Sequence, residues 1–208
     1  MNTATAPDLI HELEHEHRTR LLQAMAAVSA DKGLGLTTIA DIVREAGVSK
    51  RTFYEHFTSK ETCFLALYRA ASGSALRTLR EALKPERPWQ TQIEQALQAY
   101  FEHLAAGAGL VRVLFVDIHH LGPEGLRARR DVMQELADFM VTTVNGAALP
   151  SAAPLRAMSP AMAMAAVGGI NELVLQAIEQ GQAAELKKLT PCAGEIVRAL
   201  THTDRAGR

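Results

Sequence analysis

Apolar residues recur every three or four positions along almost the whole chain, which is the spacing of one face of an α-helix. No segment shows the sustained apolar and polar alternation that predicts a half-buried β-strand. The chain has 208 residues, of which 48% are hydrophobic, so it is long enough to enclose a hydrophobic core. We therefore expect an all-α protein of one or two domains.

Glycines, prolines and shifts of charge divide this helical pattern into three parts. Residues 1–17 are dominated by acidic side chains, which predicts a flexible lead-in. Residues 18–64 carry three short apolar stripes, which predict a small three-helix domain. Residues 65–208 predict a larger helical domain, with a Pro/Ala-rich linker that ends near Met158. Within it, the almost continuously apolar run from Leu110 to Leu121 predicts a central buried helix.

Composition and motifs exclude several classes of protein. The 22 Lys and Arg residues oppose 23 Asp and Glu residues, and a formal net charge of −1 excludes a uniformly basic nucleic-acid binder. Cys63 and Cys192 lie far apart, which argues against a disulfide framework and a zinc site. Because the chain has no G-x-S-x-G or Walker motif, we expect no enzyme. We also expect no cofactor and no bound metal.

The sequence gives little sign of export or of a membrane span. The start of the chain lacks the basic and apolar segments of a signal peptide. The charge-free stretch from Ala157 to Asn171 is too short and too rich in small residues to predict a membrane span. We therefore expect a cytoplasmic protein without a membrane partner.

Residues 37–60, TTIADIVREAGVSKRTFYEHFTSK, have the pattern of a helix-turn-helix. Two short helices that cross steeply need a small residue at their contact, which we expect Ala40 to supply. The tight turn between them needs a residue that tolerates a positive φ, and Gly47 stands there. Between Arg44 and Lys60 four basic residues face two acidic ones, so this segment is locally positive in a chain of slightly negative charge.

The run IADIVREAGVSKRTFYEHFTSKE resembles the DNA-binding signature of the tetracycline-repressor (TetR) family of one-component transcriptional regulators. The resemblance covers about residues 18–68, and AGVS, TFYEHF and SKE at these spacings are its most specific parts. The later region resembles the family only in its layout. The resemblance implies a homodimer that binds a palindromic operator in double-stranded DNA and releases it when a small-molecule effector enters the larger domain.

The resemblance also implies a set of DNA contacts. The residues expected to contact DNA are Thr38, Lys50, Arg51, Thr52, Tyr54, His56 and Lys60. The first three residues of the second helix are candidates for base edges, and the others are candidates for the phosphate backbone. Phe53 and Phe57 are expected in the core beneath that helix. Thr37 or Thr38 is also expected to cap the first helix, whether or not it touches DNA.

An effector cavity is expected among the middle helices of the larger domain. Its candidate residues are Tyr100, His103, Phe115, His119, Met133, Asn171 and Glu172. Apolar helix stripes usually form core, so the polar members are the sharper candidates for binding a ligand's polar end. His119 and His120, near Glu124, are a weak metal signal because adjacent residues on a helix point apart. The aliphatic, Met-containing surroundings favour a hydrophobic or amphipathic effector.

The last two helices are expected to form the subunit interface. Ser159-Pro160 and Thr190-Pro191 predict their starts, and small residues such as Gly168 and Gly169 permit close helix packing. Two functions compete with a repressor: a helix-turn-helix activator, since the DNA-binding head does not fix the sign of regulation, and a helical adaptor that binds no DNA. The adaptor leaves the basic pattern between Lys50 and Lys60 unexplained.

Overall fold

The structure, a computed structural model, describes residues 6–84, 86–146 and 156–201, with side chains from His15 onward. Within these residues every regular element is helical, which confirms the all-α prediction. The elements are α1 (Ala6–Leu36), α2 (Ile39–Ala46), α3 (Lys50–His56), α4 (Lys60–Ala82), α5 (Trp89–Ala106), α6 (Ala108–Val116), η1 (Asp117–Leu121), α7 (Gly122–Gly146), α8 (Pro160–Glu179), η2 (Ala183–Leu189) and α9 (Thr190–Thr201).

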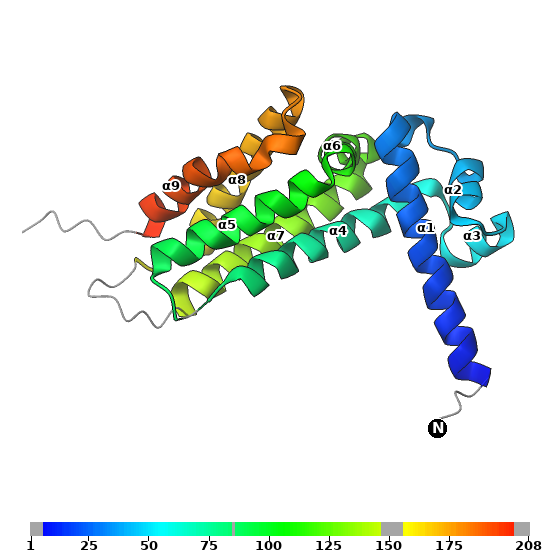
Figure 1. Cartoon of the computed structure of the whole chain (residues 1–208), viewed down its shortest axis with the longest axis horizontal. Helices are drawn as coiled ribbons and strands as arrows, with labels where there is room; N and C mark the ends of the chain where they lie inside the picture. The colour runs from blue at the N-terminus through cyan, green and yellow to red at the C-terminus, as the bar shows by residue number, and fades with distance from the viewer. Residues whose placement is uncertain (1–5, 85, 147–155, 202–208) are drawn as a thin grey trace, which may run out of the picture.

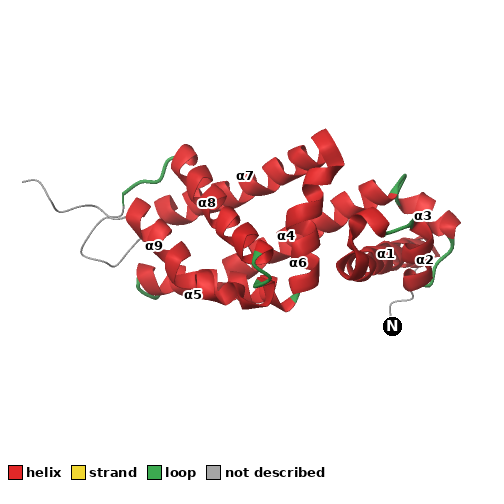
Figure 2. Ribbon diagram, turned by 90° about the horizontal axis from the view of Figure 1, so that it is seen from above, coloured by secondary structure: helices red, strands yellow, loops and turns green. Residues whose placement is uncertain are grey.

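The helices form an elongated molecule with a small head at one end (Figure 1). Helices α1, α2 and α3 make the head, and α4 leads from it into a body built from α5 to α9 (Figures 1 and 2). Helix α4 passes residues 64 and 65 without a break, and Val113 and Ile118 pack on the core of the head. Because the two parts share α4 and pack against each other, the boundary at residue 64 is proposed as a division of function and does not mark a break in the structure.

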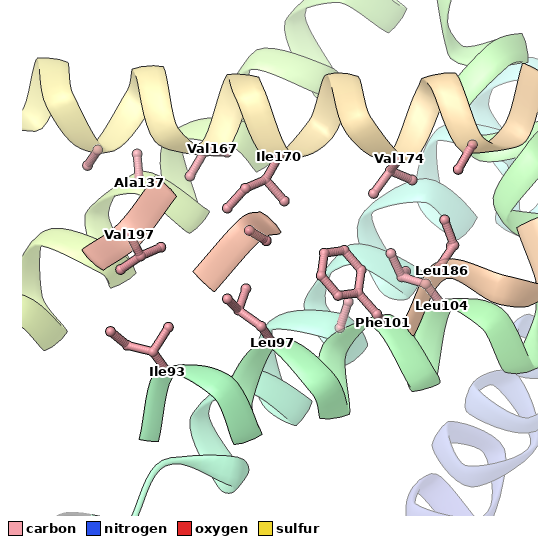
Figure 3. Packing of buried hydrophobic residues seen from close by; sticks show 14 of the residues in the cluster. Ile93, Leu97, Phe101, Leu104, Ala137, Val167, Ile170, Val174, Leu186 and Val197 are labelled. Atoms are coloured by element: carbon pink, nitrogen blue, oxygen red, sulfur yellow. The ribbon is translucent and has the colours of Figure 1, made fainter. Parts of the chain in front are cut away.

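The body has its own apolar core, formed where α5, α8 and α9 face one another. Figure 3 shows side chains of α5, including Leu97 and Phe101, pointing toward Val167, Ile170 and Val174 on α8. Phe101 is fully buried in this cluster. Burial of a large side chain stabilises the folded state by roughly 1.5–3 kcal/mol, so this contact holds the two helices together.

Two helix predictions need correction. The lead-in expected over residues 1–17 is helical from Ala6 onward, and Pro7 and Asp8 suit the first turn of a helix. The buried helix expected over residues 110–121 is a short α6 followed by the 3₁₀ helix η1. The linker expected before Met158 falls largely on residues 147–155, outside the described part of the chain.

Helix α8 is longer than the charge-free stretch suggested. Its 20 residues have the length and apolarity of a membrane-spanning helix. One face of the helix, which includes Ala163 and Val174, is buried in the body. Core helices of globular domains share this composition, so the helix is explained by its packing.

Candidate nucleic-acid interface and ligand cavity

The start of α2 is fixed by a capping box. Thr38 is the N-cap: its hydroxyl accepts a hydrogen bond from the backbone N–H of Asp41, and the Asp41 carboxylate accepts one from the Thr38 N–H. The same carboxylate binds Lys32 of α1 and Arg44 of α2. The hydrogen bond from Lys32, followed by that from Thr38, holds the pKa of Asp41 well below its usual range. These contacts tie α2 to α1.

The turn between α2 and α3 depends on Gly47, as the sequence predicted. Its φ of 62° and ψ of 38° are left-handed, a conformation that residues with a Cβ rarely adopt. Arg20 of α1 donates hydrogen bonds to the backbone oxygens of Ala46 and Gly47, and its guanidinium would lie 2.8 Å from a Cβ at Gly47. Ala40 is exposed, so it is not the small residue at the helix contact; the buried alanine of α2 is Ala46.

Helix α3 buries one face and exposes the other. Ser49 caps it by accepting a hydrogen bond from the backbone N–H of Thr52 at 3.0 Å. Phe53 is fully buried and Phe57 is 6% exposed, which confirms both as core residues. The exposed positions are Lys50, Arg51, Tyr54 and Glu55. The outer face of α3 therefore carries two cations, a phenol and one carboxylate.

The structure brings most of the expected DNA contacts to this outer face. Thr38, at the start of α2, is exposed, while Thr52 and His56 are half-buried on α3. The Arg51 side chain is 90% exposed and its Nε donates to Glu55 at 3.1 Å. An exposed pair of this kind adds little stability, so the Arg51 guanidinium can exchange Glu55 for a nucleic-acid acceptor.

Lys60 lies differently from the other candidates. Its Nζ donates to the carbonyl oxygens of Leu34, Gly35 and Thr37 at 3.0, 3.3 and 2.9 Å. These carbonyls lie at the end of α1 and in the connection to α2, where a cation also interacts favourably with the helix dipole. Lys60 thus ties α4 to the start of the helix-turn-helix, a role that its position in the sequence did not reveal.

Two cavities open inside the body. The larger has a volume of about 480 Å³ and lies among α4, α5, α6, α7 and α8. Among its lining residues are five of the seven sequence candidates: Tyr100, His103, Phe115, Met133 and Asn171. Tyr68 of α4 also lines this cavity and was missed; a tyrosine on the apolar face of a helix is the signal that marks it.

Two ligand candidates need correction. His119 and Glu172 line neither cavity, and both are exposed. His119 belongs to the 3₁₀ helix that replaces the expected continuation of α6, so its side chain turns to the surface. Glu172 follows the cavity residue Asn171 by one position on α8, and a step of one residue leads to a different face of the helix.

A family model described as "Bacterial regulatory proteins, tetR family" matches residues 21–67, the segment that runs from α1 into α4. Residues 21–67 therefore carry the DNA-binding segment of the TetR family. The match covers the head, where the capping box, the Gly47 turn and the exposed face of α3 lie. The TetR family consists of regulatory proteins, in agreement with the expectation that the chain is not an enzyme.

Curated relatives of this chain include both activators and repressors. The transcriptional activator FasR of Mycolicibacterium smegmatis is 28% identical over 109 residues, which cover 52% of this chain and 50% of FasR. The transcriptional repressor KstR2 of Rhodococcus jostii is 28% identical over 104 residues, which cover 50% of this chain and 51% of KstR2. The chain thus aligns with about half the length of these relatives.

The likeness to solved structures extends over the body as well. The crystal structure of the regulator FadR from Bacillus subtilis in complex with stearoyl-CoA matches with a TM-score of 0.69 and 17% identity. The match covers 88% of this chain and 99% of that chain. At this identity the likeness shows that the fold is shared.

Proposed function

We propose that the chain is a DNA-binding transcriptional regulator whose helix α3 reads the major groove. The observation that carries this proposal is the outer face of α3, where Lys50, Arg51 and Tyr54 are exposed above the buried Phe53. A helix of a helix-turn-helix enters the major groove with its first residues against base edges. Arg51 suits a bidentate contact to guanine, and Lys50 suits a phosphate or a guanine.

The remaining candidates are assigned to the DNA backbone. Thr38 supplies a hydroxyl at the start of α2, and Tyr54 and His56 supply polar groups at the middle and end of α3. Thr52 lies beside Ser49, with 2.9 Å between their hydroxyl oxygens, and completes the start of α3. Lys60 contributes positive charge near a phosphate while its ammonium holds the end of α1.

A homodimer through α8 and α9 places two such heads on one operator. Ala165 and Gly169 are exposed one turn apart on α8, although the same helix buries its opposite face in the body. Small side chains of this kind permit two helices to approach closely. A dimer with two-fold symmetry matches a palindromic operator, whose half-sites lie about one helical turn apart.

The dimer is tested by light scattering at micromolar concentration. The wild-type chain should have twice the mass of one protomer, and Ala165→Arg should reduce the mass to that of a monomer because it introduces two charges at the symmetry-related contact. Ala70→Arg places the same charge on an exposed position of α4 and should leave the dimer intact. A monomeric wild type, or a dimer that tolerates Ala165→Arg, contradicts this interface.

The larger cavity is proposed as the effector site, and residues 65–208 as the ligand-binding and dimerisation domain. A volume of about 480 Å³ lies within the range of small-molecule sites, and the lining is mostly apolar. FadR, which shares the fold, was crystallised with stearoyl-CoA, so a ligand with an apolar part suits this architecture. We propose that a hydrophobic or amphipathic effector releases the protein from its operator in the cytoplasm, as in a repressor.

The sign of regulation is proposed as repression, with activation as the alternative because FasR is an activator. Selection of genomic DNA fragments by the purified protein tests the DNA-binding function. A short palindrome enriched by the wild type and lost with Arg51→Ala supports the regulator. Failure to enrich any fragment supports a helical adaptor instead. Expression of the adjacent gene in a strain that lacks the protein then gives the sign.

A further inference from the structure

The two cavities of the body share a wall. The smaller cavity, of about 80 Å³, is lined by Tyr100, Leu136 and Asn171, which also line the larger one. From this shared wall the larger cavity extends to Leu114 of α6, while the smaller one extends to Phe139 of α7. The two spaces therefore adjoin at these three side chains, here called the waist, and the joined space suits a long ligand better than a round one.

Neither cavity is lined by a formal charge. Among the described residues that form their walls there is no Asp, Glu, Lys or Arg. An ionised carboxylate moved into such surroundings loses its hydration and gains no counter-ion, so the enclosed part of a ligand must be neutral. His103 is the lining residue that carries an ionisable imidazole, and it is exposed, which places it at the opening.

Polar groups without partners gather near the waist. The phenol oxygens of Tyr68 and Tyr100 and the side-chain amide of Asn171 make no hydrogen bond to another described residue. Burial raises the pKa of both tyrosines to about 12, so each keeps its proton at neutral pH and can donate. These polar groups line an otherwise apolar cavity, which makes this cluster the place for a ligand's polar atom.

We propose that the joined cavities bind one elongated, uncharged molecule: an aliphatic chain that passes the waist into the smaller cavity, with an alcohol, ketone or ester oxygen near Tyr68, Tyr100 and Asn171. The proposal rests on the proposed function, because this is the same effector cavity. It specifies an effector with a neutral head group. Fatty acids and cationic surfactants have the same aliphatic part and a charged head group, so the proposal excludes them.

Calorimetric titration of the full chain without DNA tests the head group. The probes are decan-1-ol, decanoate and decylammonium at pH 7.5, which have the same chain. We expect decan-1-ol to bind at least tenfold more tightly than either ion. Tyr68→Phe and Tyr100→Phe should each weaken decan-1-ol binding about two- to twelvefold, which corresponds to one lost hydrogen bond. Equal or tighter binding of decanoate, or no binding of any probe, overturns the proposal.

A chain-length series tests the joined cavity. From octan-1-ol to tetradecan-1-ol each added methylene should strengthen binding about fourfold until the smaller cavity is full. Leu79→Trp fills that cavity from α4, so the gain should stop at a shorter chain. Leu83→Trp makes the same change one turn further along, outside both linings, and should behave as wild type. An unchanged series with Leu79→Trp contradicts the passage through the waist.

The two proposals fail separately. If the protein enriches a DNA palindrome but prefers the ions, the regulator stands and the neutral ligand falls. If it binds the alcohols in the expected order but enriches no DNA, the ligand class stands and the DNA-binding function falls.

Discussion

The carboxylate of Asp117 accepts a hydrogen bond from the backbone N–H of Leu34 at 2.8 Å, across 83 positions of the chain. Leu34 follows Gly33, whose φ of 80° and ψ of 158° interrupt α1 just before the helix-turn-helix. Asp117 directly follows α6, which contributes to the larger cavity. This bond therefore connects the helix beside the effector cavity with the segment that enters α2.

Asp117→Ala should weaken this junction. The Leu34 N–H would stay buried without a partner, which costs about 1–3 kcal/mol, whereas Asp117→Asn keeps an oxygen acceptor and should cost less. Urea unfolding measures the loss, and operator release by a saturating ligand should also become less complete in the alanine variant. If the two variants and the wild type have the same free energy of unfolding, the hydrogen bond between Asp117 and Leu34 does not stabilise this junction.

Lys60→Ala should lower the free energy of unfolding as well. Its ammonium donates to three carbonyls, and hydrogen bonds to a charged group contribute about 1.5–3 kcal/mol. Lys50 is exposed and makes no such bond, so Lys50→Ala is the matched control. It should unfold like the wild type yet reduce the dependence of operator affinity on log salt by about one. Identical unfolding curves for both variants would contradict the structural role of Lys60.

These two contacts show where sequence reasoning stops. The helical class, the Gly47 turn and the burial of Phe53 follow from local spacing and glycine chemistry, and the sequence predicts all three. The bond between Asp117 and Leu34 joins residues that no periodicity relates. The sequence shows that Lys60 has the charge expected of a phosphate contact. Its hydrogen bond to the carbonyl oxygen of Leu34 at the end of α1 appears only in the structure.

Arg51→Ala should relax operator preference without changing stability. The Arg51 side chain is 90% exposed and its pair with Glu55 is a surface pair. Loss of a bidentate contact to a base costs about 1–3 kcal/mol at that base pair. Titrations against operators with single base-pair changes measure the effect. Glu55→Gln breaks the same ion pair and keeps the Arg51 guanidinium, so this variant should keep the operator preference. If Glu55→Gln relaxes the operator preference and Arg51→Ala does not, the preference depends on the ion pair and not on a contact of Arg51 to DNA.

Asp41 should make the head sensitive to acid. Its hydrogen bonds from Lys32 and Thr38 depress the pKa in the folded state, so its stabilising contribution is present at neutral pH. That contribution is lost as the pH falls below the ordinary Asp pKa, about 3.9, toward the lower folded value. Urea unfolding at pH 7 and pH 3 should show a smaller decline for Asp41→Asn than for wild type. Glu45→Gln removes an exposed carboxylate that has no ion pair among the described residues and should decline as wild type does.

The sequence predicts which kinds of residue line the cavity, but it does not predict which of them the fold brings together. Tyr100 and Asn171 are polar residues on apolar helices, a pattern that the sequence displays, and both line the two cavities. His119 has the same pattern and lies at the surface, because α6 ends early and η1 turns the chain. Tyr68 lies beyond the helix-turn-helix in sequence, and its place in the cavity depends on how α4 packs against α5 and α7.

Hydroxyl-radical footprinting on a selected fragment tests most directly whether two copies of α3 lie in the DNA. The dimer should protect two patches on each strand, with centres one helical turn apart, about 10–10.5 base pairs. Lys50→Ala and Arg51→Ala should weaken both patches equally, because each half-site receives the same helix. A single patch, or protection that neither variant alters, would contradict the placement of α3 in successive major grooves.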